Sequence, residues 1–190
     1  MDAHMASSSY CATSKHPKKG ITMKLAMIGL LAAGLASTAT AAIELTLDNP
    51  RGFRDFEIRT RTAEAVASVF QAEFERAAEH RLNAMVPEGH TLELTVTDID
   101  MAGEIQPSRN MNHPDIRYVE SNYPPRMTFN YRLVDAEGNE VSSGQEHLRD
   151  LTFDLGAPKI GRDNTFRYEI ALIEDWMQDN IRSIAENEKE

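Results

Sequence analysis

With 190 residues, 41% of them hydrophobic, the chain has the length and composition of one globular domain with its own core. Its formal net charge of −10 and the lack of a basic cluster argue against binding to nucleic acids or anionic lipid surfaces, since phosphate groups repel an acidic protein. With Cys11 as its one cysteine, the chain can form no internal disulfide.

The first predicted element is a cleavable export signal at residues 23–41. An apolar run at 25–36 follows Lys24, and Ala39-Thr40-Ala41 supplies the small residues that a signal peptidase requires. The run is too short to cross a bilayer as a helix, which takes about 20 residues. Residues 1–22 are an extension or a misassigned start, and they are left out of the fold prediction.

Cleavage after Ala41 would leave residues 42–190 as one domain, periplasmic or secreted. The leader carries four lysines and one aspartate, so its removal changes the formal net charge from −10 to −13. Cys11 leaves with the leader and precedes the apolar run, whereas a lipoprotein needs its cysteine directly after that run. We therefore expect no stable membrane anchor and no thiol chemistry.

A strand and a long helix come next. Apolar and polar residues alternate at 43–47, which is typical of a half-buried strand. Between residues 62 and 85 the apolar residues recur every three or four positions, which predicts an amphipathic helix with Thr60 or Thr62 as its cap. Pro87 ends this helix.

Three further strands follow the helix. Alternating patterns cover residues 92–97 and 127–133, and a turn at 135–139 leads to a strand that begins near Glu140. The apolar positions of this last strand change side along its length, so a bulge is expected at Gly144.

The last predicted element is a helix, because apolar residues recur at helical spacing from Phe166 to Ile184. Asp163, Asn164 or Thr165 can cap its start. The resulting order is β-α-β-β-β-α. We predict an α+β domain in two layers, with a mostly antiparallel four-stranded sheet and two helices on one face.

One segment does not fit this plan. Residues 101–126 form a long polar connection with four prolines and one short predicted strand at 116–119. Connections of this length are often functional, although a mobile excursion explains the composition as well. Tyr123-Pro124-Pro125 is either a stiff entry into the next strand or a platform for a ligand.

The best local candidate for a site is acidic. Asp98, Asp100 and Glu104 lie where a strand opens into the long connection, and His113 is a further candidate contact for a ligand or cation. Such carboxylates can hold a hard cation such as calcium, or they can accept hydrogen bonds from loop amides. The spacing fails the EF-hand pattern, because Ala102 stands where an oxygen ligand is needed.

No complete catalytic motif is present. The sequence has no His-Glu-x-x-His pair, no Gly-x-Ser-x-Gly elbow and no glycine-rich phosphate loop. We therefore predict no catalytic residue, no metal ligand and no cofactor, while paired carboxylates assembled by the fold stay open as acid–base groups.

Several fragments in order carry a family resemblance: residues 97–104, 123–126, 129–136, 148–150 and 174–176. Together with the signal, they resemble a bacterial family of exported proteins catalogued as a domain of unknown function (number 3016). The resemblance implies an exported domain of about this size, and it implies no catalytic residue, cofactor or partner.

Two functional hypotheses follow. The first is a non-enzymatic binding or accessory module of the cell envelope, whose partner is an unidentified envelope protein or ligand and not a nucleic acid. The second is a small metal-dependent or carboxylate-using periplasmic hydrolase that employs Asp98, Asp100 and Glu104 with His113.

Overall fold

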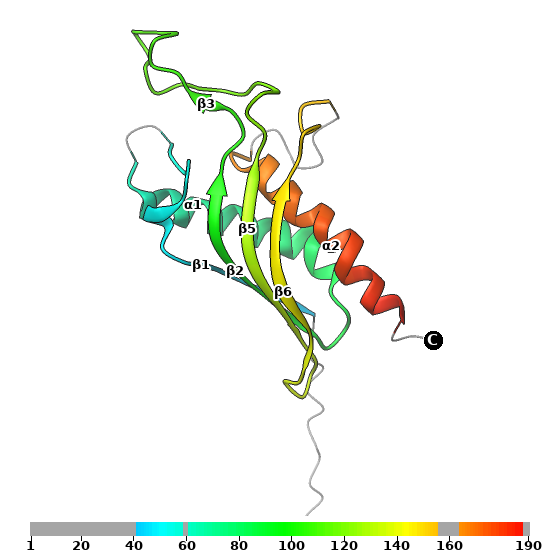
Figure 1. The fold of residues 1–190 in the computed structure, drawn as a ribbon. Helices are drawn as coiled ribbons and strands as arrows, with labels where there is room; N and C mark the ends of the chain where they lie inside the picture. Colours follow the sequence, from blue (N-terminus) through cyan, green and yellow to red (C-terminus); the bar gives the residue numbers. More distant parts are fainter. Residues whose placement is uncertain (1–40, 59–60, 156–163, 188–190) are drawn as a thin grey trace, which may run out of the picture. The chain divides into compact units, whose positions relative to one another are not determined.

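The computed structural model describes residues 41–58, 61–155 and 164–187, which all belong to one compact unit of the chain. The predicted export signal, apart from its last residue Ala41, and Thr60 lie outside the described residues. The described part is α+β in two layers: a four-stranded sheet with two helices on one face (Figure 1). In that part, no helix is long and apolar enough to cross a membrane.

The sheet is mixed, so the prediction of a mostly antiparallel sheet was wrong. Its strand order is β1 (Ala42–Leu47), β2 (Thr91–Asp100), β5 (Arg126–Val134) and β6 (Glu140–Arg149). β1 pairs in parallel with β2, and the other two pairings are antiparallel. The reason is the connection between β1 and β2, because a helical crossover brings the chain back in its original direction.

This crossover is the first predicted helix, and its extent is confirmed. α1 (Ala63–Ala77) continues into a π-helical turn at Ala78–Leu82 and a 3₁₀ turn at Asn83–Met85. The Thr62 hydroxyl caps α1 by accepting a hydrogen bond from the amide of Ala65 at 3.3 Å.

The second helix, α2, spans Arg167–Asn187. The Asn164 side chain accepts a hydrogen bond from the Phe166 amide just before the helix begins, at 2.8 Å. Asp163 lies outside the described residues.

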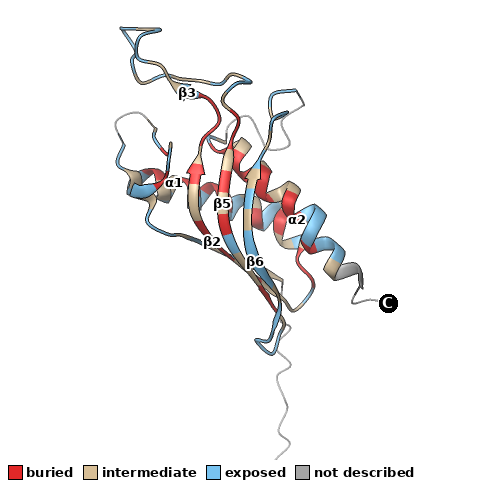
Figure 2. Cartoon of the chain, viewed as in Figure 1, coloured by how far each residue is buried: buried red, intermediate tan, exposed pale blue. Residues whose placement is uncertain are grey.

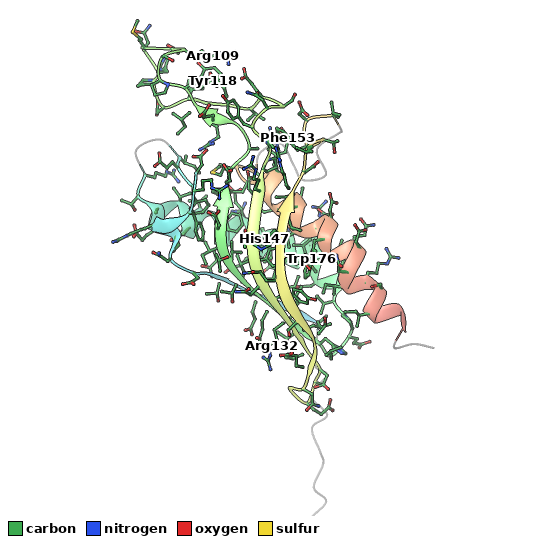
Figure 3. The ribbon with its side chains drawn as sticks, viewed as in Figure 1. Arg109, Tyr118, Arg132, His147, Phe153 and Trp176 are labelled. Carbon is green, nitrogen blue, oxygen red and sulfur yellow. The ribbon has the colours of Figure 1, made fainter. Side chains whose placement is uncertain are left out.

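The core lies between the sheet and the two helices (Figure 2). Phe166 packs edge-on against Phe70 of α1, with 5.0 Å between the ring centroids. Trp176 is 5% exposed and contacts Phe129 and Tyr131 of β5. It is labelled in Figure 3.

The predicted bulge at Gly144 was also wrong. Gly144 lies in regular register opposite Tyr131, and the irregularity of this pairing lies between Leu133 and Val134, where Val141 is the extra residue of β6. A second shift, at Thr97 of β2, was not predicted.

Residues 101–125, called the arm from here on, contain a second small sheet. β3 (Glu104–Ile105) pairs with β4 (Arg117–Tyr118), so the strand expected at 116–119 exists in shorter form and its partner was missed. The observed order therefore adds two short strands to β-α-β-β-β-α, of which β4 was expected and β3 was not. At the arm, the Arg109 guanidinium lies 4.3 Å from the centre of the Tyr118 ring (Figure 3). Pro124 and Pro125 are buried directly before β5.

Candidate functional site

The predicted carboxylates Asp98 and Asp100 lie on the side of β2 that faces away from the helices. Thr97 is the extra residue between two register positions, Val96 opposite Phe129 and Asp98 opposite Thr128. Ile99 is therefore buried in the core. Without the extra residue, strict alternation would turn the two aspartates toward the helices.

Both aspartates lie within ion-pair distance of arginine side chains. Asp98 accepts a hydrogen bond from the Arg54 amide at 2.8 Å and lies 3.7 Å from its guanidinium. Asp100 lies 3.9 Å from Arg54 and 3.6 Å from Arg126. Burial raises the pKa of Asp100 and Arg126 opposes that rise, while the neighbouring Asp55 adds to it.

The four predicted site residues are only partly brought together. Asp100 and Glu104 line one polar cleft of about 410 Å³, whereas Asp98 and His113 are not in its lining. A hydrogen bond to Glu104 raises the pKa of the Tyr123 hydroxyl, which also lines the cleft. Among the residues the structure describes, no group of three or more histidine, cysteine, aspartate or glutamate side chains is placed to hold a metal ion.

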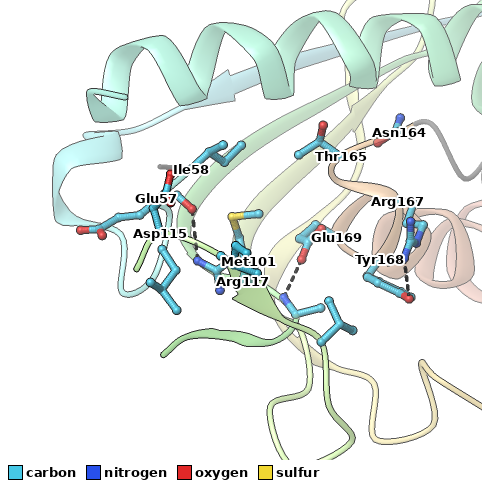
Figure 4. Close-up of a pocket in the computed structure, with 14 residues that line it drawn as sticks. Glu57, Ile58, Met101, Asp115, Arg117, Asn164, Thr165, Arg167, Tyr168 and Glu169 are labelled. Atoms are coloured by element: carbon cyan, nitrogen blue, oxygen red, sulfur yellow. Dashed lines mark hydrogen bonds between the residues drawn. The ribbon is translucent and has the colours of Figure 1, made fainter. Parts of the chain in front are cut away.

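A second cavity, of about 390 Å³, lies where the arm meets the start of α2 (Figure 4). This volume is in the range of small-molecule sites, about 300–1,000 Å³. Aliphatic side chains form one part of its lining: Ile58, Met101, Ala102, Ile105, Ile116 and Val119. The other part is polar or charged: Glu57, Asp115, Arg117, Asn164, Thr165, Arg167, Tyr168 and Glu169.

Arg117 of β4 fixes one wall of this cavity. Its two terminal nitrogens donate to the two carboxylate oxygens of Asp55 at 2.7 and 2.8 Å. They also donate to the carbonyls of Gly103 and Glu57, at 2.9 and 3.2 Å. Both side chains of this bidentate pair are largely shielded from solvent, which strengthens it over a surface ion pair.

Glu169 is the most unusual group in the lining. It belongs to the first turn of α2, is 1% exposed, and accepts a hydrogen bond from the Ala102 amide through Oε1 at 2.8 Å. Oε2 is buried and finds no hydrogen-bond partner among the described residues. Burial raises the pKa of this carboxyl to about 7, although the Ala102 amide and the charges of Arg117 and Arg167 oppose the rise.

Glu169 was not predicted as a site residue from the sequence, although the sequence contains a signal for it. Glu169 is three residues after Phe166 and four before Ile173, so it lies on the apolar face of its helix. Glu73 on α1 follows the same rule and is 8% exposed. An acid at a core position of a helix is rare, and it is informative for that reason.

The comparisons with solved structures give low similarity. Two crystal forms of PelC dodecamers from Paraburkholderia phytofirmans are both 12% identical, with TM-scores of 0.33 and 0.30. The two alignments cover 70% and 74% of this chain, and 79% and 87% of the PelC chains. A minor lipoprotein from Acinetobacter baumannii is 11% identical, with a TM-score of 0.28 over 78% of this chain and 95% of its own. Values this low support no conclusion about function or assembly.

The comparison with curated proteins returned no match. A family model does match, and it covers residues 41–179, which include α1, the arm, the whole sheet and α2 as far as Asp179. The resemblance seen in the sequence is thereby confirmed. The chain belongs to the family described as protein of unknown function, DUF3016.

Proposed function

We propose that the chain is a non-enzymatic binding module of the cell envelope, and that the cavity beside Glu169 is its binding site. The observation that carries the proposal is the combination of an aliphatic wall with a buried carboxyl in one cavity. Binding sites for small molecules are mostly apolar with a few precisely placed polar groups, and this lining follows that plan. The envelope location rests on the predicted export signal.

The mouth of the cavity supports the proposal. Ile116 and Val119 of the arm line the cavity and are 39% and 44% exposed. Exposed aliphatic side chains at the rim of a cavity are stabilised when a ligand covers them. The arm is held to the rest of the domain by the Arg117–Asp55 pair, so these side chains are presented on a fixed wall.

The alternative, a metal-dependent or carboxylate-using hydrolase at Asp98, Asp100 and Glu104, has less support. Arg54 and Arg126 already balance the charge of the two aspartates, so a cation would have to displace them. That hypothesis predicts that calcium, magnesium, zinc or manganese raises the melting temperature, and that alanine at Asp98 or Asp100 abolishes the rise. An unchanged melting temperature with all four cations would remove its metal-dependent form.

A neutral apolar fluorophore, N-phenyl-1-naphthylamine, tests the binding proposal. We expect saturable binding of one molecule per chain, because the dye can cover the aliphatic wall without meeting charge repulsion. Ile116→Asp should weaken binding at least tenfold. Val141→Asp is the matched control, since Val141 is also 39% exposed but belongs to β6 and does not line the cavity. Absent binding, or equal loss in both variants, would contradict the proposal.

A further inference from the structure

We infer that the cavity binds an aliphatic primary ammonium group, which donates a hydrogen bond to Oε2 of Glu169 while its alkyl chain packs against the aliphatic wall. The inference rests on the proposed function and names the ligand class of the same site. A free alkylamine and a lysine side chain of a partner share this chemistry.

The two carboxylate oxygens of Glu169 differ in their surroundings. Its Oε1 is used by the Ala102 amide, whereas its Oε2 is buried with no hydrogen-bond partner in the described part of the chain. A buried oxygen without a donor is costly, and most such atoms in folded proteins are paired. Figure 4 shows Glu169 extending from α2 between Arg117 and Tyr168, and a dashed line marks the hydrogen bond that it accepts from the Ala102 amide. A ligand that brings a donor would complete this site.

The charged side chains of the lining favour a cationic ligand. The lining acids Glu57, Asp115 and Glu169 outnumber the lining arginines, and Asp55 balances one of these, Arg117. An anionic ligand would meet these acids, and the terminal nitrogens of Arg117 already donate to Asp55 and to two carbonyls. A cation is therefore favoured over an anion, in agreement with the formal net charge of −10.

The aliphatic wall of the cavity suits an alkyl chain. The aliphatic lining lies in the same cavity as the carboxyl, so one linear molecule can contact both. Burial of a methylene group changes a dissociation constant by roughly fourfold. Lengthening an n-alkylamine from butyl to hexyl should therefore tighten binding by roughly fourfold per added carbon.

The pH dependence gives this site a distinct signature. An ammonium ion needs the ionised form of Glu169, whose pKa lies at about 7 in the free protein. The charged groups around it are Arg117 from β4, Arg167 from α2, and the lining acids Glu57 and Asp115. Both arginines and an alkylammonium stay charged from pH 6 to 8. Affinity should fall as pH drops through 7, approaching tenfold per pH unit below it.

Displacement of N-phenyl-1-naphthylamine tests the ligand class with the full domain. At pH 8, hexylamine should compete at least tenfold better than hexanol, which has the same alkyl chain and no charge. Glu169→Gln should remove this preference and its pH dependence while hexanol still competes. Glu73→Gln is the matched control, because Glu73 is also a buried helical acid but does not line the cavity, and it should keep the preference.

The outcomes separate the two proposals. If the dye and hexanol bind but hexylamine is no better than hexanol, the ammonium inference is wrong and the binding module stands. If the dye itself does not bind, both fail. A preference that survives Glu169→Gln would also overturn the inference. Within the ammonium class, competition by Nα-acetyl-lysine methylamide as strong as that by butylamine indicates a partner's lysine, and weaker competition indicates a free amine.

Discussion

The buried Glu169 carboxyl makes a quantitative prediction about stability. Replacing it by glutamine keeps the shape of the side chain and the acceptor for the Ala102 amide, and it removes the ionisable group. Glutamine cannot lose a proton, so any part of the pH dependence that comes from Glu169 disappears in this variant.

The sign and the size of this pH dependence follow from the pKa of Glu169. Between pH 4.5 and about 7 the folded protein keeps a proton on Glu169 that the unfolded chain has released, so the free energy of unfolding falls as pH rises. The difference between 4.5 and about 7 corresponds to about 3 kcal/mol. The free energy of unfolding of Glu169→Gln, taken relative to that of the wild type, should therefore rise by about 3 kcal/mol between pH 4 and pH 8. It should rise little further above pH 8.

Urea denaturation followed by tryptophan fluorescence measures this difference, because Trp176 is a buried reporter and the chain's one tryptophan. The variant and the wild type should be compared at several values between pH 4 and 9. Glu73→Gln retains Glu169, so its free energy of unfolding should still show the fall with rising pH that Glu169 causes between pH 4.5 and about 7. Parallel curves for the wild type and Glu169→Gln would refute the reasoning, since they would mean that Glu169 ionises as easily in the fold as in water.

Two further predictions concern the backbone and a helix cap. Gly103→Ala should destabilise the domain by at least about 1 kcal/mol more than Gly138→Ala, although both glycines have φ near 80°. The added Cβ at Gly103 would lie 2.4 Å from the carbonyl oxygen of Tyr118, whereas a Cβ at Gly138 would meet no atom within 4 Å. Equal losses in urea denaturation would contradict this. Thr62→Ala should cost about 1 kcal/mol through loss of the α1 cap. Ser68→Ala, in an exposed part of the same helix, should stay within about 0.5 kcal/mol of the wild type.

The sequence predicted the parts of the fold that depend on periodicity. Both helices and all four main strands were located, because apolar residues at spacings of two or of three and four reflect which side of an element is buried. Alternation does not specify the direction of the neighbouring strand, so the parallel pairing of β1 with β2 could not be read from it. The two-residue strand β3 is too short to show any period.

The candidate site was harder to predict, since it depends on contacts between distant segments. Asp98 and Asp100 were noticed for their charge, but their partners Arg54 and Arg126 come from two other segments. Glu169 meets an amide 67 residues earlier in the chain. Composition near each residue carries no information about such encounters.

The extra residue Thr97 affects both the predicted aspartates and the cavity beside Glu169. Because Thr97 is an extra residue, Ile99 and Met101 continue the buried side of β2, while Asp98 and Asp100 turn to the arginines. The same phase brings Met101 and Ala102 to the cavity, where the Ala102 amide reaches Glu169. The sequence contains the signal for this shift, since two polar residues in succession, Thr97 and Asp98, interrupt an alternation that resumes with Ile99. One inserted residue thus decides that Asp98 and Asp100 meet arginines and that the Ala102 amide reaches the buried Glu169.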